Sequence, residues 1–207
     1  MKSIAIVSAG IRFPGANTLA AFTSILEGAC DVSQDVDEDR WQKRGNRAAK
    51  DESFFHNRAY RINHTQETGD GLAIDPELLT KLDPLFHLGL GAAREAFKGC
   101  HTEGLDKTRC GVILGNIALP TETSSRMASE WLSEEWGLGA VERRYDSANL
   151  SPAAMPAQVI AKALGITGNT FTLDAACASS LYALKLASDE LMEGRLDFVL
   201  AGGLSRP

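Results

Sequence analysis

The sequence has no hydrophobic stretch near the roughly 20 residues that a membrane-spanning helix needs. Its N-terminus also lacks a basic segment followed by a long apolar run, so we predict no signal peptide and no membrane span. Cysteine is scarce: the 207 residues include four, at positions 30, 100, 110 and 177, with no CxxC pair. That spacing argues against a disulfide scaffold and predicts a cytoplasmic protein.

The chain carries no excess of positive charge. It has 21 Lys and Arg against 27 Asp and Glu, a formal net charge of −6. This balance argues against nucleic acid as a main partner, although an acidic protein could still dock on a local basic patch. With 44% hydrophobic residues, a chain of this length buries a substantial core, and we predict one domain or a large part of one.

Patterns for metal and nucleotide sites are incomplete or absent. Residues 35–40, Asp-Val-Asp-Glu-Asp-Arg, begin like a calcium loop, but arginine replaces the turn glycine and Asn46 the final glutamate. Cys100, His101 and Cys110 lack a fourth ligand at zinc-site spacing. No glycine loop of the P-loop or dinucleotide type precedes a helix. We therefore predict no metal and no nucleotide cofactor.

Short apolar runs alternate with helical patterns along the chain, which predicts an α/β fold with a mostly parallel sheet. We predict strands at residues 4–7, 112–114, 169–173 and 198–201. Helices are predicted at 19–26 after a cap at Asn17 or Thr18, from Asp83-Pro84, at 121–136, from Ser151-Pro152 to Gly165, and from Cys177 to Gly194. The polar stretch 31–75 is interpreted as a surface excursion.

Three of these helices have apolar positions that predict which face turns inward. The first is the helix after Asp83, with Leu85, Leu88, Ala92 and Ala96. The second, at 121–136, has few apolar anchors and is predicted to lie over a cleft: Met127, Trp131 and Leu132. The third precedes Gly165, with Met155, Val159, Ile160 and Ala163.

Cys177 is the most informative residue. It stands where the apolar strand that ends at Leu173 passes through small residues into an amphipathic helix, at the helix N-terminus. Unpaired N–H groups and the positive end of the helix dipole favour a thiolate there and could hold an oxyanion. The small residues Ala175, Ala176, Ala178 and Ser179 leave room for a sharp turn and a close substrate. An unpaired cysteine is nevertheless more often inert packing.

The surrounding segment resembles a known active site. Residues 174–181, Asp-Ala-Ala-Cys-Ala-Ser-Ser-Leu, are similar to the catalytic segment of the β-ketoacyl synthases, condensing enzymes of fatty acid and polyketide synthesis with a thiolase-type fold. That family usually has Asp-Thr-Ala-Cys-Ser-Ser-Ser-Leu, so this chain differs at positions 175 and 178. Further similarities occur in order at 4–7, 10–15, Arg40-Trp41, 82–84, 111–115 and 201–203.

The resemblance implies decarboxylative Claisen condensation. Cys177 would be the nucleophile that accepts an acyl group, its backbone N–H would contribute to the oxyanion hole, and a malonyl thioester would supply the two-carbon unit. An acyl carrier protein with phosphopantetheine-linked acyl and malonyl groups is the implied partner. The resemblance also implies a homodimer formed through the strand at 169–173. Within the family, the residues around Cys177 are most similar to synthases of polyunsaturated or polyketide-like lipids.

Ketosynthases carry two catalytic histidines and a lysine well after the cysteine. Here His56, His64, His87 and His101 all precede Cys177, and we assign none of them a catalytic role. We therefore expect residues 1–207 to be the N-terminal half of a longer synthase, incomplete at the C-terminus. Alone it should not condense, and it should expose an apolar face that promotes association.

Two alternatives remain open at the level of sequence. The first is a non-elongating, structural or dimer-partner subunit, because the family's histidines are not seen. The second is a coenzyme A-primed condensing enzyme of the same fold, whose motif also contains Ala-Ala-Cys-Ala. Cysteine at 177, rather than glutamine or glycine, favours an elongating synthase over the first. The loop Phe13-Pro14-Gly15, the Arg40-Trp41 pair and residues 179–181 argue against the second.

Overall fold

The structure is a computed structural model that describes residues 3–35, 58–62, 66–117, 119, 121–137, 149, 151 and 153–206. Arg40-Trp41, His56, His64 and the acidic residues 36–40 lie outside the described residues. The chain divides into two compact units, Met1–Gly10 with Thr65–Pro207, and Ile11–His64.

The larger unit is built on a parallel sheet of three strands in the order β4-β3-β5. The central strand is β3 (Cys110–Asn116), and its neighbours are β4 (Thr170–Leu173) and β5 (Phe198–Leu204). Gly115 of β3 is level with Leu173 on one side and with Gly203 on the other. The α/β fold and three of the four predicted strands are thus confirmed.

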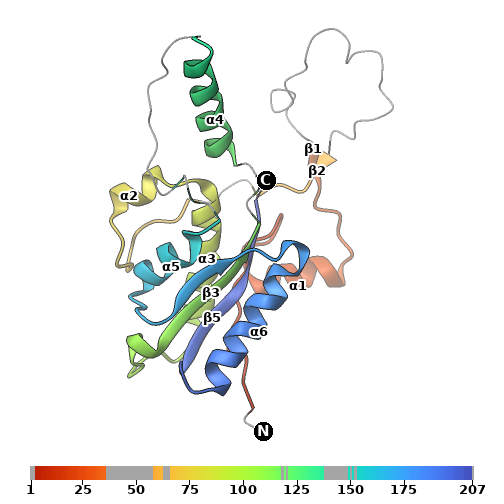
Figure 1. Ribbon diagram of the computed structural model, residues 1–207. Helices are drawn as coiled ribbons and strands as arrows, with labels where there is room; N and C mark the ends of the chain where they lie inside the picture. Colours follow the sequence, from red (N-terminus) through yellow and green to blue (C-terminus); the bar gives the residue numbers. More distant parts are fainter. Residues whose placement is uncertain are drawn as a thin grey trace. The chain divides into compact units, whose positions relative to one another are not determined.

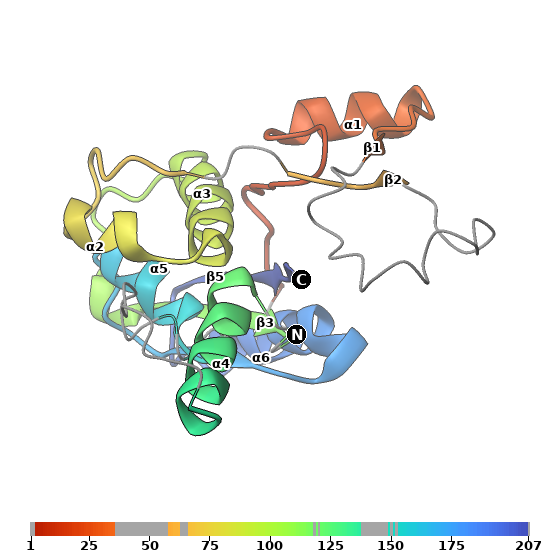
Figure 2. The same ribbon diagram turned by 90° about the horizontal axis from the view of Figure 1, so that it is seen from above.

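Helices cover both faces of this sheet (Figures 1 and 2). On one face, α3 (Pro84–Lys98) and α5 (Pro156–Leu164) pack against Val112 and Leu114. On the other face, α6 (Ser179–Met192) places Ala183 and Ala187 against Ile113. Every residue of β3 is buried, because the side chains of a strand alternate between two covered faces.

Two helices begin with the same local signal, an aspartate followed by proline. Asp83 accepts a hydrogen bond from the Leu85 N–H at 3.0 Å at the start of α3, as predicted. Asp75 caps α2 (Pro76–Lys81) in the same way, and this helix was not predicted from sequence. The first two turns of α3 are buried on all sides, from Leu85 to Gly91, so the predicted apolar stripe was too narrow.

The helix predicted from Ser151 begins later. The Ser151 carbonyl accepts hydrogen bonds from the N–H groups of Ala154 and Met155, which form a separate turn. Helix α5 starts at Pro156, a residue whose fixed φ and missing N–H suit the first helical position. Its end at Gly165, with φ of 68°, and its buried face are as predicted.

Helix α4 (Glu122–Glu135) lies in the predicted region, but two of its three predicted anchors are exposed. Met127 is buried, whereas Trp131 and Leu132 are 67% and 41% exposed. Figure 1 shows α4 extending away from the sheet, so its second half leaves the packed body.

The predicted strand at residues 4–7 is wrong. Residues 3–10 form no strand, and β5 pairs directly with β3 along its whole length. The segment instead lies against α3: a Cβ on Gly10 would come within 2.0 Å of the Ala92 carbonyl oxygen. Ile6 and Val7 are 87% and 66% exposed as a result.

In the smaller unit, α1 (Leu19–Glu27) begins after Thr18, whose hydroxyl accepts a hydrogen bond from the Ala21 N–H at 3.2 Å. This confirms the predicted helix and selects Thr18 as its cap. Two short strands, β1 (Gln34–Asp35) and β2 (Arg58–Ala59), pair antiparallel. The stretch predicted as a surface excursion thus contains this strand pair among its described residues.

Two glycines bring the start of α6 onto the sheet. A Cβ on Gly115 would lie 2.4 Å from the Ser179 carbonyl carbon and 2.7 Å from its Cβ. A Cβ on Gly203 would lie 2.8 Å from the Ser180 Cβ. Because Gly115 and Gly203 are partners in the sheet, they form one flat platform beneath the first turn of α6.

We predict that Gly115→Ala lowers the free energy of unfolding by about 1–3 kcal/mol, because the helix must move away from the strand. Gly202→Ala is the matched control. No atom lies within 4 Å of a Cβ built at Gly202, and its effect should stay within about 0.5 kcal/mol. Urea unfolding of both variants measures the difference. Equal stabilities would contradict the packing described for Gly115.

Candidate active site

Cys177 lies in a sharp connection between β4 and α6. The strand ends at Leu173, a single 3₁₀ turn spans Ala176–Ala178, and α6 follows at Ser179. The thiol is free and exposed. Ala176, directly before it, has φ of 49°, a left-handed conformation that costs a residue with a Cβ about 1–2 kcal/mol. The predicted turn therefore exists and carries local backbone strain.

Two side chains hold the strained residue in place. The Asp174 carboxylate accepts a hydrogen bond from the Ala176 N–H at 2.9 Å. The Ser179 hydroxyl accepts one from the Ala175 N–H at 2.8 Å and donates one to the Ala176 carbonyl at 2.7 Å. Ser179 is 5% exposed. The peptides on both sides of Ala176 are thus fixed by bonds from within the motif.

The backbone around the thiol offers a hydrogen-bond donor. Among the described residues, the structure records no acceptor for the Cys177 N–H, whereas the Ala178 N–H is bonded to the Ala175 carbonyl at 3.1 Å. The N-cap position of α6, Ala178, makes no side-chain cap bond. An N–H beside the nucleophile, at the positive end of a helix, is suited to hold an oxyanion.

A buried polar cluster also lies at this carboxyl end of the sheet. Asp83 is 2% exposed, and its N–H donates to the Asn149 side-chain oxygen at 2.8 Å. The Asn149 amide in turn donates to the Lys81 carbonyl at 2.7 Å. Arg206, two residues beyond β5, lies 3.9 Å from the Asp83 carboxylate. From sequence, Asp83 was predicted only as a helix cap, and no local pattern indicated Asn149 or Arg206.

The Asp83 carboxyl is held in its charged form. Burial alone would raise its pKa, but the hydrogen bond from the Leu85 N–H lowers it. The hydroxyls of Thr123 and Thr121 and the charge of Arg206 lower it further, so the pKa of Asp83 lies below its usual value. This buried charge connects the start of α3 to the segment before α4 and to the chain after β5.

The two described histidines do not form part of a catalytic group with Cys177. His87 is buried in α3, and its Nδ1 accepts a hydrogen bond from the Glu67 N–H at 3.0 Å. Burial lowers the pKa of His87, so the ring is neutral at pH 7. His101 is exposed in the loop after α3. His87 is therefore a buried packing residue of α3.

The other cysteines lie in different surroundings. Cys110 is buried at the start of β3, and burial raises its pKa, which makes it a poor nucleophile. Within the described ranges, no cluster of three His, Cys, Asp or Glu side chains is placed to hold a metal ion. In the same ranges, no helix has both the length and the apolar character to cross a membrane.

The family model "Beta-ketoacyl synthase, N-terminal domain" matches residues 1–207. The chain belongs to the β-ketoacyl synthase family. A ketosynthase chain described as "PfaC Keto synthase-Chain length factor" superimposes with a TM-score of 0.81 at 28% identity, covering 96% of this chain and 24% of that one. The fold is therefore thiolase-like, as the resemblance implied.

Curated relatives are polyketide synthases. The chain is 27% identical to "PKS-NRPS hybrid synthetase ATPKS" from Aspergillus niger, over 99% of this chain. It is 29% identical to "Polyketide synthase PksN" from Bacillus subtilis, also over 99% of this chain. It spans 11% of the length of the first protein and 4% of the length of the second.

We predict that Ser179→Ala lowers the free energy of unfolding by about 1–2 kcal/mol, because the Ala175 N–H loses its acceptor and the Ala176 carbonyl keeps only the Ser179 backbone N–H. Ser180→Ala is the matched control, since Ser180 is exposed and should shift stability by about 0.5 kcal/mol or less. The rate at which iodoacetamide alkylates Cys177 should differ from that of the unsubstituted protein in Ser179→Ala but not in Ser180→Ala. Identical alkylation rates in both variants would contradict the assigned role of Ser179.

Proposed function

We propose that this chain carries the nucleophile of a condensing ketosynthase and that Cys177 is the residue acylated. The observation that carries the proposal is an exposed thiol in a strained turn, beside a backbone N–H with no recorded acceptor among the described residues. An accessible thiol next to an oxyanion donor is what acyl transfer requires. Family membership supports the same chemistry.

The first step is transfer of an acyl group between thiols. The Cys177 sulfur, as thiolate, attacks the carbonyl carbon of an acyl thioester, and the Cys177 N–H stabilises the oxyanion that forms. The intermediate collapses by breaking the bond to the carrier sulfur, which leaves as a thiol after taking up a proton. The acyl group then remains on the protein as a thioester.

The second step forms a carbon–carbon bond. A malonyl thioester loses carbon dioxide, the resulting enolate attacks the acyl carbonyl on Cys177, and the Cys177 thiolate is released with a β-ketoacyl product two carbons longer. The enolate needs its own hydrogen-bond donors. We assign these donors to the family's two histidines and lysine in the complete enzyme, not to His87 or His101. By this proposal the chain alone does not condense.

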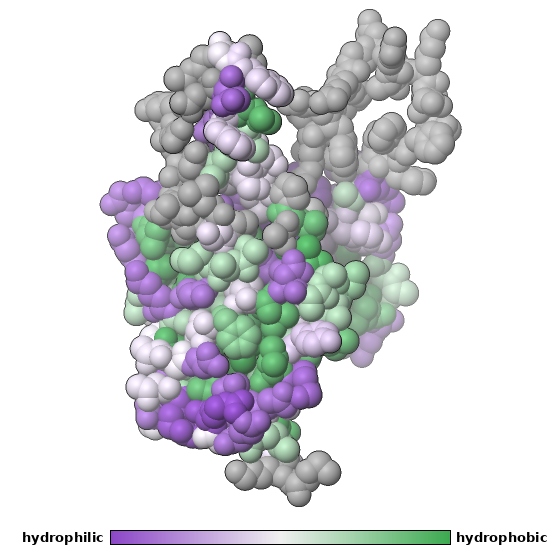
Figure 3. Space-filling model, in the orientation of Figure 1, coloured by the Kyte–Doolittle hydropathy of each residue, from purple (hydrophilic) through white to green (hydrophobic). Residues whose placement is uncertain are grey.

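We infer that the partner is an acyl carrier protein in the cytoplasm whose phosphopantetheine arm brings both thioesters. The exposed face of α6 supports a role within a larger enzyme. Leu181, Tyr182 and Leu184 are 69%, 56% and 47% exposed, and Figure 3 shows hydrophobic surface where α6 lies in this view. Apolar surface of this kind marks an interface, which we assign to the rest of the synthase.

A second candidate function is that of a ketosynthase-like subunit that assembles but does not condense. The observation that favours it is the position of His87, buried and engaged away from Cys177. Acylation of Cys177 distinguishes this candidate from a condensing ketosynthase, because a subunit with a purely structural role needs no acyl-accepting thiol. A coenzyme A-primed condensing enzyme would accept the acyl group from coenzyme A rather than from a carrier protein.

We expect one acyl group to be added per chain when the protein is incubated with hexanoyl-pantetheine, as measured by intact-protein mass spectrometry. The addition should fall to background in Cys177→Ala. It should persist in Cys30→Ala, the matched control, because Cys30 is also exposed but lies outside the motif. An adduct retained in Cys177→Ala would disprove the assignment of the nucleophile.

We also infer a homodimer formed through the free side of β4. The Asn169 carbonyl accepts a hydrogen bond from the Val112 N–H at 3.2 Å. The Thr170 N–H belongs to the same trans peptide and therefore points away from β3. An antiparallel partner strand needs such outward donors.

Thr170→Pro removes that donor, and we expect it to raise the dimer dissociation constant at least about tenfold, since proline cannot donate to a ladder. Thr170→Val is the matched control: it also loses the threonine hydroxyl bond to the Gly168 carbonyl but keeps the N–H. Analytical ultracentrifugation measures both constants, with urea unfolding as a check on stability. A folded Thr170→Pro variant that dimerises as tightly as Thr170→Val would contradict the interface.

A further inference from the structure

The larger unit has a cavity of about 280 Å³ at the end of the sheet opposite Cys177. Phe97 lines it and also packs edge-on against Phe198, the first residue of β5, with ring centroids 5.8 Å apart. Cys177 lies in the turn that follows β4, at the opposite end of the strands from Phe198. Because a strand rises about 3.3 Å per residue, the length of β3 puts roughly 20 Å between these two edges of the sheet. The cavity is therefore separate from the proposed active site.

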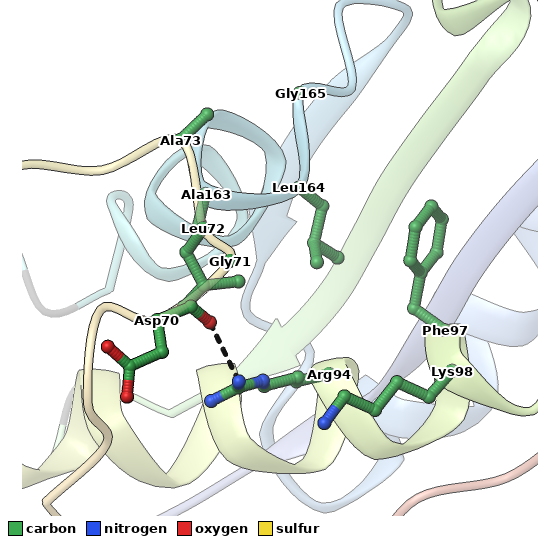
Figure 4. A pocket seen from close by; sticks show the side chains of 10 residues that line it. All are labelled: Asp70, Gly71, Leu72, Ala73, Arg94, Phe97, Lys98, Ala163, Leu164 and Gly165. Carbon is green, nitrogen blue, oxygen red and sulfur yellow. Dashed lines mark hydrogen bonds between the residues drawn. The ribbon is translucent and has the colours of Figure 1, made fainter.

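The walls of the cavity are mainly apolar. Three segments form them: the loop at 70–73, the last turns of α3 and the end of α5. Figure 4 shows the side chains of Leu72, Phe97 and Leu164 facing a common space. The volume is close to the lower end of the roughly 300–1,000 Å³ that small-molecule sites occupy, so its occupant would be small and largely apolar.

Two cations on α3 line the same cavity, and they are used differently. Arg94 donates to the Asp70 carbonyl at 2.7 Å and forms an ion pair with Glu67 at 3.4 Å. Its guanidinium thus holds the loop in place. Lys98 is exposed, and the described part of the chain contains no recorded acceptor for its ammonium group. Lys98 therefore has a charge available for a ligand.

The charge around the cavity favours an anion. Lys98 is the lining residue whose positive charge is available, because the guanidinium of Arg94 is engaged with Asp70 and Glu67. Figure 4 shows the Asp70 carboxylate directed away from Lys98, while the backbone oxygen of Asp70 binds Arg94. Glu67 is engaged with Arg94. An apolar wall with one available lysine at its margin suits a molecule with an apolar body and one negative group.

We propose that this cavity binds a small aliphatic carboxylate, with its chain against Leu72, Phe97 and Leu164 and its carboxylate paired with Lys98. The site is independent of the chemistry at Cys177. The alternative role for Lys98, a favourable charge in the last turn of α3, requires no ligand.

The probe is hexanoate, titrated into the protein and followed by NMR of methyl groups, with the neutral amide hexanamide as its uncharged counterpart. Saturable shifts are expected at the methyls of Leu72 and Leu164. Lys98→Met should weaken hexanoate binding at least about fivefold and leave the weaker hexanamide binding unchanged. Lys162→Met is the matched control, because Lys162 is exposed on α5 but does not line the cavity.

The proposal is overturned if hexanoate gives no saturable shifts at Leu72 and Leu164, or if the shifts fall instead on the exposed Leu181 and Leu184 of α6. Equal weakening by Lys98→Met and Lys162→Met would also overturn it, since that result indicates a general effect of charge. Alkylating Cys177 beforehand should not alter the titration, which distinguishes this site from the proposed acyl site.

Discussion

The close contact between the first turn of α6 and the Gly115–Gly203 pair is the constraint on which the rest of the site depends. These two residues are level in the sheet, and side chains on them would overlap Ser179 and Ser180. With Ser179 seated there, its hydroxyl bonds both the Ala175 N–H and the Ala176 carbonyl. A Cβ at position 115 or 203 would push the start of α6 away from the sheet. Both Ser179 hydrogen bonds would then break together, and the exposed thiol would lose its fixed position.

The elements that sequence predicted well are those with local signals. Asp83 and Thr18 cap helices through hydrogen bonds two or three residues away, and Gly165 ends α5 in the left-handed conformation that glycine favours. Asp75 gave the same signal before Pro76 and was missed because the region had been interpreted as a loop. The prediction for residues 4–7 failed for a different reason: a short apolar run fits a strand, but whether the segment pairs depends on contacts across the whole sheet.

The candidate site was predictable in part. The position of Cys177 between strand and helix followed from periodicity, and the small residues around it indicated a sharp turn. The role of Ser179 required knowing that Gly115, 64 positions earlier in the chain, leaves space for it. The link between Asp83 and Asn149 spans 66 residues, and no local pattern in the sequence encodes a contact over such a distance.

The energetics of the turn explain why its polar bonds come from within the motif. A left-handed alanine costs about 1–2 kcal/mol, and a typical intramolecular hydrogen bond contributes a net of about 1 kcal/mol. The three bonds from Asp174 and Ser179 therefore suffice to offset the strain at Ala176 without using the Cys177 N–H. If that N–H were needed to hold the turn, it could not also receive an oxyanion. Asp174 and Ser179, on either side of the thiol, thus hold the turn, and the Cys177 N–H is left to bind an oxyanion.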